Sequence, residues 1–151
     1  MKKSGHRRLR IGRTSIAGCA YLITTVTRNR LPFFLDLRTA RVVIRVMREA
    51  DNRGDARTLA YVLMPDHLHW LMVLGENRSL SRVVQSVKAS SARKVGTALW
   101  QRGFHDRAVR KENDLLHMAR YVVANPLRKG LVDHVGGYSH WDAVWLKDTP
   151  E

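Results

Sequence analysis

Two histidines separated by one residue stand inside an apolar run, in His67-Leu68-His69. Alternate side chains of a β-strand point to opposite faces of its sheet, so both imidazoles are expected on one face, with Leu68 and Trp70 on the other. Two neutral imidazoles side by side can bind one divalent ion. The alternative is a pair of histidines with purely structural partners, so this motif alone is a weak signal.

Tyr121 lies in a segment with helical periodicity. At roughly 100° per residue, one side of that helix collects the apolar residues Leu115, Leu116, Ala119, Val123 and Leu127. Tyr121 falls roughly opposite this stripe, on the side that carries Asp114, His117, Asn125 and Arg128. A tyrosine that serves only packing is expected inside the stripe, although exposed tyrosines are common on protein surfaces.

These residues together form a candidate site for phosphoryl transfer. The side-chain oxygen of Asn125, one helical turn after Tyr121, could join His67 and His69 around a divalent ion. A phenol with a pKa of about 10 is a poor nucleophile at neutral pH, so Tyr121 needs a polarised phosphate or a nearby cation, for which Arg128 is a candidate. Taken singly, Asn125 is better explained as a helix-ending residue before Pro126, and Arg128 has the alternative of being a surface arginine.

The elements expected to position these residues alternate between strands and helices. Residues 17–27 read as a strand and residues 35–50 as a helix that Asp36 can cap. Residues 58–63 and 67–74 are two apolar runs around a turn that contains Pro65, which predicts a β-hairpin. A second helix begins at Ser79 or Ser81, a short strand follows around residues 100–107, and a third helix capped by Asn113 or Asp114 ends near Asn125 because of the proline after it.

This order predicts an α+β fold. An antiparallel sheet with a central β-hairpin is covered by helices, in the split-βαβ arrangement of ferredoxin-like domains. The hairpin argues against a doubly wound parallel sheet. We expect one domain over residues 17–151, preceded by a basic arm over residues 1–16.

Composition favours a polyanionic partner. The 151 residues include 27 Lys and Arg against 13 Asp and Glu, a formal net charge of +14. Nucleic acid is the preferred partner and an anionic membrane surface the competing one. No apolar run is long enough to span a membrane, the residues before Cys19 lack the apolar stretch of a lipoprotein signal, and a single cysteine fits a cytoplasmic protein. The basic residues expected to contact DNA are Arg7, Arg8, Arg10 and Arg13 in the arm, Lys88 and Arg93 on the second helix, and Arg128.

Four segments resemble the REP-associated tyrosine transposases of the HUH endonuclease superfamily, which are related to the single-tyrosine transposases of bacterial insertion sequences. The two long signatures are Met64-Pro65-Asp66-His67-Leu68-His69-Trp70 and Tyr121-Val122-Val123-Ala124-Asn125-Pro126-Leu127-Arg128-Lys129-Gly130-Leu131-Val132. The shorter ones are Trp100-Gln101-Arg102-Gly103-Phe104-His105-Asp106 and Gly137-Tyr138-Ser139-His140-Trp141. The resemblance therefore extends from about residue 17 to residue 145.

The resemblance implies a metal site at His67, His69 and Asn125 that binds Mg²⁺ or Mn²⁺, with Tyr121 as the nucleophile. It also implies a covalent 5′-phosphotyrosine, a free 3′-hydroxyl, and recognition of single-stranded DNA folded into palindromic hairpins. The family usually has Asn before the first histidine, and this chain has Asp66. We favour a monomer over a homodimer.

Two other functions remain open at this stage. One is a hairpin-binding protein for DNA or RNA that keeps the fold without the chemistry, which the charge alone would support. The other is a zinc hydrolase that uses His67, His69 and a further histidine.

Overall fold

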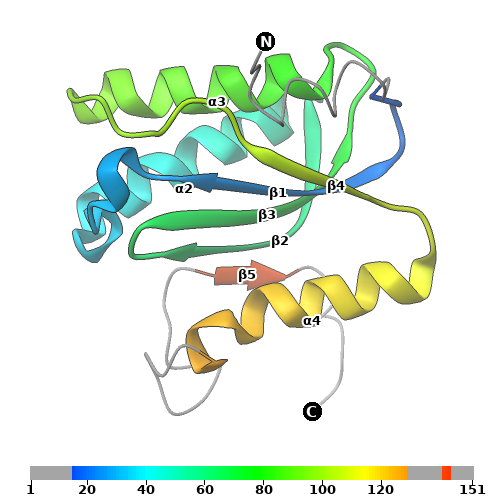
Figure 1. Cartoon of the computed structure of the whole chain (residues 1–151). Coiled ribbons are helices and arrows are strands. Elements are labelled where there is room, and N and C mark those ends of the chain that lie inside the picture. Colours follow the sequence, from blue (N-terminus) through cyan, green and yellow to red (C-terminus); the bar gives the residue numbers. More distant parts are fainter. Residues whose placement is uncertain (1–14, 129–140, 144–151) are drawn as a thin grey trace, which may run out of the picture.

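A computed structural model describes residues 15–128 and 141–143, which form a single antiparallel sheet with helices on both faces (Figure 1). In chain order the elements are β1 (Ala20–Val26), the 3₁₀ turns η1 (Arg28–Arg30) and η2 (Phe33–Leu35), α2 (Leu37–Asn52), β2 (Ala56–Met64), β3 (His67–Leu74), α3 (Leu80–Val95), β4 (His105–Val109), α4 (Glu112–Arg128) and β5 (Trp141–Ala143). The strand order is β4-β1-β3-β2-β5, and every neighbouring pair is antiparallel. The predicted α+β class with a central β2–β3 hairpin is confirmed.

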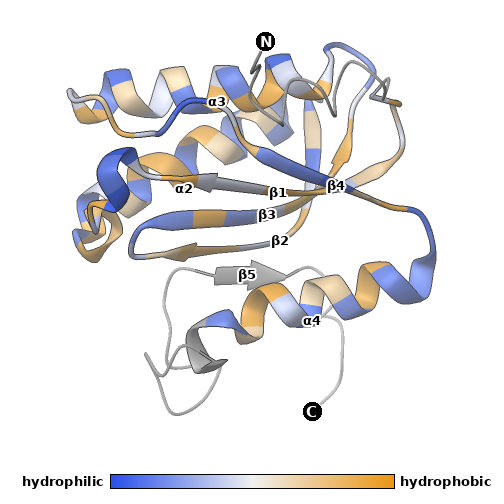
Figure 2. Cartoon of the chain, in the orientation of Figure 1, coloured by the Kyte–Doolittle hydropathy of each residue, from blue (hydrophilic) through white to orange (hydrophobic). Residues whose placement is uncertain are grey.

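Each face of the sheet has its own apolar core. On one face, side chains of β3 such as Leu68 and Trp70 pack with α2 and α3. On the other face, Leu71 packs with Ala119 and Val122 of α4. Figure 2 shows polar and apolar residues alternating along all three helices, as expected for helices that bury one face. Alternate residues of β3 therefore face the α2–α3 layer and α4 in turn.

The predicted starts of the first two α-helices are confirmed. The Asp36 side chain accepts a hydrogen bond from the Arg38 amide at the start of α2. The Ser79 side chain accepts one from the Arg82 amide at the start of α3, which decides between the two serines considered. α3 ends at Gly96, whose φ of 89° is a left-handed conformation that glycine adopts without strain.

The fourth strand lies later in the chain than predicted. Regular pairing with β1 covers His105–Val109, whereas Trp100 makes only an isolated bridge to Thr27. The Trp100 indole N–H donates to Ser91 Oγ at 2.9 Å, so this residue belongs to the contact with α3. Trp100 was therefore expected in a strand because it is aromatic, whereas in the structure it packs beside a helix. The short β5 beside β2 was not predicted.

The third helix is longer than predicted at both ends. α4 begins at Glu112, so Asn113 and Asp114 lie in its first turn, and it continues through Pro126 to Arg128. The preference of a pre-proline residue for extended backbone is outweighed here by packing, because Val122 and Val123 directly before it are buried against the sheet.

The remaining expectations concern membrane-spanning helices and the basic arm. Within it, no helix is long and apolar enough to cross a membrane. The arm residues Arg7, Arg8, Arg10 and Arg13 lie outside the described residues.

Candidate nuclease site

The two histidines lie on the face of the sheet that α4 covers. They share β3 with Leu71, which belongs to the α4-side core, while Leu68 between them faces the α2–α3 layer. Their ring centroids are 4.8 Å apart and the rings are nearly perpendicular, at 83°. The predicted shared face is confirmed. Because β3 has β1 on one side and β2 on the other, the backbone that carries both rings is hydrogen-bonded along both edges.

The Nδ1 atom of each histidine has a partner within the protein. His67 Nδ1 lies 2.7 Å from Asp66 Oδ1, and His69 Nδ1 lies 3.0 Å from the hydroxyl of Thr24. Thr24 is opposite His69 in the β1–β3 register. With both Nδ1 atoms engaged, a metal bound by this pair would be coordinated through the Nε2 atoms. A second hydrogen bond of this kind from the far ring nitrogen is the usual arrangement of metal-binding histidines.

Asp66 is held on several sides. Its Oδ2 accepts from Arg30 Nη1 at 3.2 Å, and its backbone carbonyl accepts from both the amide and the hydroxyl of Thr27. Partial burial alone would raise the pKa of the Asp66 carboxyl. The hydrogen bonds from His67 and Arg30, together with the Arg30 charge, outweigh burial and hold that pKa below its usual value, so Asp66 is a carboxylate at neutral pH.

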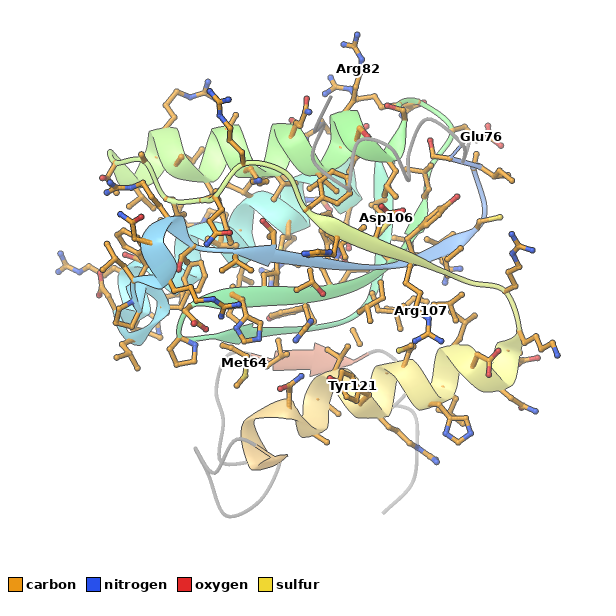
Figure 3. The ribbon with its side chains drawn as sticks, viewed as in Figure 1. Met64, Glu76, Arg82, Asp106, Arg107 and Tyr121 are labelled. Carbon is orange, nitrogen blue, oxygen red and sulfur yellow. The ribbon has the colours of Figure 1, made fainter. Side chains whose placement is uncertain are left out.

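Tyr121 comes to the same place from α4. Its ring centroid is 6.2 Å from that of His69, with the rings at 68°, and the residue is 39% exposed. In Figure 3 the Tyr121 side chain lies on the side of α4 that faces the sheet, toward the face on which Met64 also lies. The nucleophile proposed from sequence and the first-choice metal ligands are therefore neighbours in space.

The buried stripe of α4 differs from the predicted one. Leu116, counted as a core residue, is 37% exposed, whereas Val122 is fully buried. The buried face is thus rotated toward Tyr121, which lies on its flank and not opposite it. Asn125, expected beside Tyr121 on an exposed face, is 3% exposed. Each of these shifts brings the polar residues of the helix closer to the sheet.

The predicted DNA-contact residues on α3 lie on the opposite face of the sheet from the histidines (Figure 1). Lys88 Nζ donates to the carbonyl oxygens of Gln101 at 2.7 Å and Gly103 at 2.6 Å, and burial lowers the pKa of Lys88 to about 8. Arg93 is exposed. Arg128 is the last residue of α4, and its side chain lies outside the described part. DNA contact by these residues stays a prediction.

A basic cleft was not found by sequence reasoning. Arg107 of β4, Arg110 and Lys111 between β4 and α4, and His117 of α4 line a cleft of about 470 Å³, whose lining also includes one acidic residue, Asp114. Figure 3 shows the Arg107 side chain on the side of β4 that faces α4. β4 is an edge strand of the sheet, and His117 is one helical turn before Tyr121. In the sequence, the only indication of this cleft was a local excess of basic residues just before the third helix.

The donor set at the histidines suits a hard or borderline divalent ion. Together with the carboxamide oxygen of Asn125, one helical turn after Tyr121, the two imidazole nitrogens would make a mixed nitrogen and oxygen set. Over residues 15–128 and 141–143, no cluster of three or more His, Cys, Asp or Glu is arranged to bind a metal. The zinc hydrolase with a third histidine therefore has no support in that range.

Comparison with known proteins identifies the family of this chain. Residues 15–125 match the model of the family described as transposase IS200-like. A Haemophilus influenzae protein named as a REP-associated tyrosine transposase is 28% identical over 139 residues, which span 78% of this chain and 76% of that protein. The REP-associated tyrosine transposase of Escherichia coli is 26% identical over 129 residues, with 82% of this chain and 75% of the relative covered. The solved structure of a REP-associated tyrosine transposase bound to a REP hairpin superposes with a TM-score of 0.73 and 25% identity, over 93% of this chain and 82% of the other. This chain, with its histidine pair facing a helix-borne tyrosine, belongs to the IS200-like transposase family.

Proposed function

We propose that this protein is a metal-dependent endonuclease and strand transferase for single-stranded DNA that contains a hairpin, with Tyr121 as its nucleophile. The observation that carries the proposal is the position of the Tyr121 ring, 6.2 Å from that of His69 and partly exposed. A nucleophile must be both close to the group that activates the phosphate and open to a large substrate. Among the described tyrosines, Tyr21 is buried in the core on the other face of the sheet and does not meet these requirements.

In the proposed reaction the Tyr121 phenolic oxygen attacks the scissile phosphorus and loses its proton. The bond from phosphorus to the 3′-oxygen breaks, and that oxygen takes up a proton to become a free 3′-hydroxyl. The fragment downstream of the cut stays linked to the Tyr121 oxygen through its 5′-phosphate, as a phosphodiester of the phenol. Because one phosphodiester replaces another, attack by a 3′-hydroxyl can reverse the step and rejoin strands without an external energy source.

His67, His69 and Asn125 are the residues that would hold the metal, with Mg²⁺ or Mn²⁺ as the expected ion. When bound, such an ion supplies positive charge that polarises the scissile phosphate and favours its attack by a weak nucleophile. Asp66 and Thr24 support this role because they contact the Nδ1 atoms, so that coordination would use the Nε2 atoms.

A hairpin substrate is supported by charge and by relationship. The chain carries a formal net charge of +14, and a structurally similar transposase has been solved with a REP hairpin bound. The cleft lined by Arg107 and Lys111 also reaches His117, one helical turn before Tyr121 on α4. We infer that the hairpin and its flanking single strand bind on the α4 side of the sheet.

The test uses fluorescent single-stranded hairpins from the source genome, Mn²⁺, and a denaturing gel that separates protein–DNA adducts. Tyr121→Phe should abolish the adduct and leave hairpin affinity within about threefold, because only the attacking oxygen is lost. Tyr61→Phe on β2, which faces the α2–α3 side of the sheet, is the matched control and should still form the adduct. Cleavage by Tyr121→Phe at the wild-type rate would show that the nucleophile is another group. Tight binding by the wild type without any nicking would instead support a hairpin-binding protein that lacks the chemistry.

A further inference from the structure

We propose that Asp66, anchored by Arg30 and Thr27, is a positioning residue that fixes His67 in the tautomer whose Nε2 lone pair is free to bind the metal. The inference rests on the metal site of the proposed function. It explains why one of the proposed ligands, His67, would present its Nε2 atom to the metal. It concerns a hydrogen bond that exists in the protein before any metal binds.

The argument begins with the chemistry of a carboxylate, which can only accept hydrogen bonds. At 2.7 Å from Asp66 Oδ1, His67 Nδ1 must therefore carry the proton. In a neutral imidazole the other nitrogen, Nε2, is then unprotonated and able to coordinate. Asp66 thus determines which nitrogen of His67 is the ligand.

Thr24 cannot determine the tautomer of His69 in the same way. A hydroxyl can donate as well as accept, so the 3.0 Å contact between Thr24 Oγ1 and His69 Nδ1 is compatible with a proton on either ring nitrogen. The Thr24 contact by itself therefore does not decide the tautomer of His69, whereas the Asp66 contact decides that of His67.

The anchoring of Asp66 makes its role specific. Thr27 is fully buried, and its amide and hydroxyl hold the Asp66 carbonyl at 2.9 Å and 3.0 Å. Arg30 Nη1 holds the carboxylate oxygen that His67 does not use. The backbone and the side chain of Asp66 are therefore restrained from the same segment, which directly follows β1.

That segment has an unusual backbone. Asn29 and Arg30 have φ angles of 54° and 51°, and two successive non-glycine residues in the left-handed region are unfavourable. Such strained backbone persists only where the surrounding structure enforces it, and it concentrates at functional sites. In this protein the strained turn carries Arg30, the residue that reaches Asp66.

The primary test is nitrogen NMR of the histidine rings in the metal-free protein near pH 8. In the wild type, His67 should show a protonated Nδ1 and a bare Nε2. Asp66→Ala should shift His67 toward the Nε2-protonated form that free imidazoles prefer. Asp66→Asn should keep part of the wild-type signal, since an amide oxygen also accepts, and Thr24→Val should change only His69.

Mn²⁺ affinity, measured by calorimetry without DNA, is the second readout. Asp66→Ala should weaken binding about 10- to 100-fold, the usual effect of losing such a partner, and Asp66→Asn should weaken it less. Arg30→Gln should have a smaller effect of the same sign. Arg53→Gln breaks a similar arginine–aspartate pair with Asp55, away from the histidines, and should leave Mn²⁺ affinity unchanged.

The outcomes separate this inference from the proposed function. If the wild type binds no Mn²⁺ and Tyr121 forms no adduct, the proposed function fails, while the NMR measurement still tests the role of Asp66. If the His67 signals of Asp66→Ala equal those of the wild type in a folded variant, the inference is wrong whatever the activity. Equal Mn²⁺ affinity of wild type and Asp66→Ala would overturn it as well.

Discussion

Lys88 gives the structure a pH-dependent stability that can be measured. Burial lowers its pKa from 10.5 to about 8, although its bonds to two carbonyl oxygens favour the charged form and oppose the effect of burial. Between these pH values the unfolded chain has a protonated Lys88 and the folded chain a neutral one. Unfolding therefore takes up a proton, and raising the pH favours the folded state. A pKa difference of this size corresponds to about 3 kcal/mol, an upper bound because the group is only partly buried.

The assay is urea unfolding followed by fluorescence of the four tryptophans, at pH 7.5, 9.0 and 10.5. Lys88→Met should cost about 2 kcal/mol at pH 7.5, where it leaves the carbonyls of Gln101 and Gly103 without their donor. The difference from wild type should then grow by about 1 to 2 kcal/mol toward pH 10.5, less than the upper bound because solvent screens the exposed part of the group. Lys94→Gln, on the same helix and paired with exposed Glu49, should cost less than about 1 kcal/mol at pH 7.5. A wild-type to Lys88→Met difference that stays constant over this range would refute the reasoning.

Three further changes test other parts of the fold and the basic cleft. Gly75→Ala places a methyl group against the backbone of Gly54 and should lower the free energy of unfolding by about 1 to 3 kcal/mol in urea denaturation, so an effect below about 0.5 kcal/mol would contradict the close approach. Ser79→Ala removes the cap of α3 and should lower it by about 1 kcal/mol, whereas Ser79→Asp should keep it near wild type. Arg107→Gln combined with Lys111→Gln should reduce the salt dependence of hairpin binding by about 1.4 in logarithmic slope, and an unchanged slope would exclude the cleft as a phosphate contact.

The arrangement of the histidine pair was predictable because it depends only on local geometry. A strand alternates its faces without exception unless a bulge intervenes, and none occurs in the β1–β3 pairing across His67 and His69. The caps Asp36 and Ser79 were predictable for a similar reason, since a cap is a contact within a few residues of chain. These features need no knowledge of the rest of the fold.

The supporting contacts could not be predicted from the chain alone. The Thr24–His69 contact depends on the register between β1 and β3, which lie far apart in sequence. The Arg30–Asp66 contact depends on a left-handed turn that no local preference for arginine would suggest. Asp66 was visible only as a departure from the usual Asn, without an indication of what the carboxylate would contact.

The rotated stripe of α4 shows how apolar packing sets the geometry of a polar site. Val122 is fully buried and packs in the core beside Leu71, two residues along β3 from His69. This packing fixes both the rotation of α4 and its position along the strand, and Tyr121, the neighbour of Val122 in sequence, is thereby placed beside His69. Counting Leu116 in place of Val122 as core rotates the helix and turns the tyrosine away from the sheet. The distance between Tyr121 and the histidine pair therefore depends on the apolar packing to which Val122 and Leu71 contribute, and neither of these is a candidate site residue.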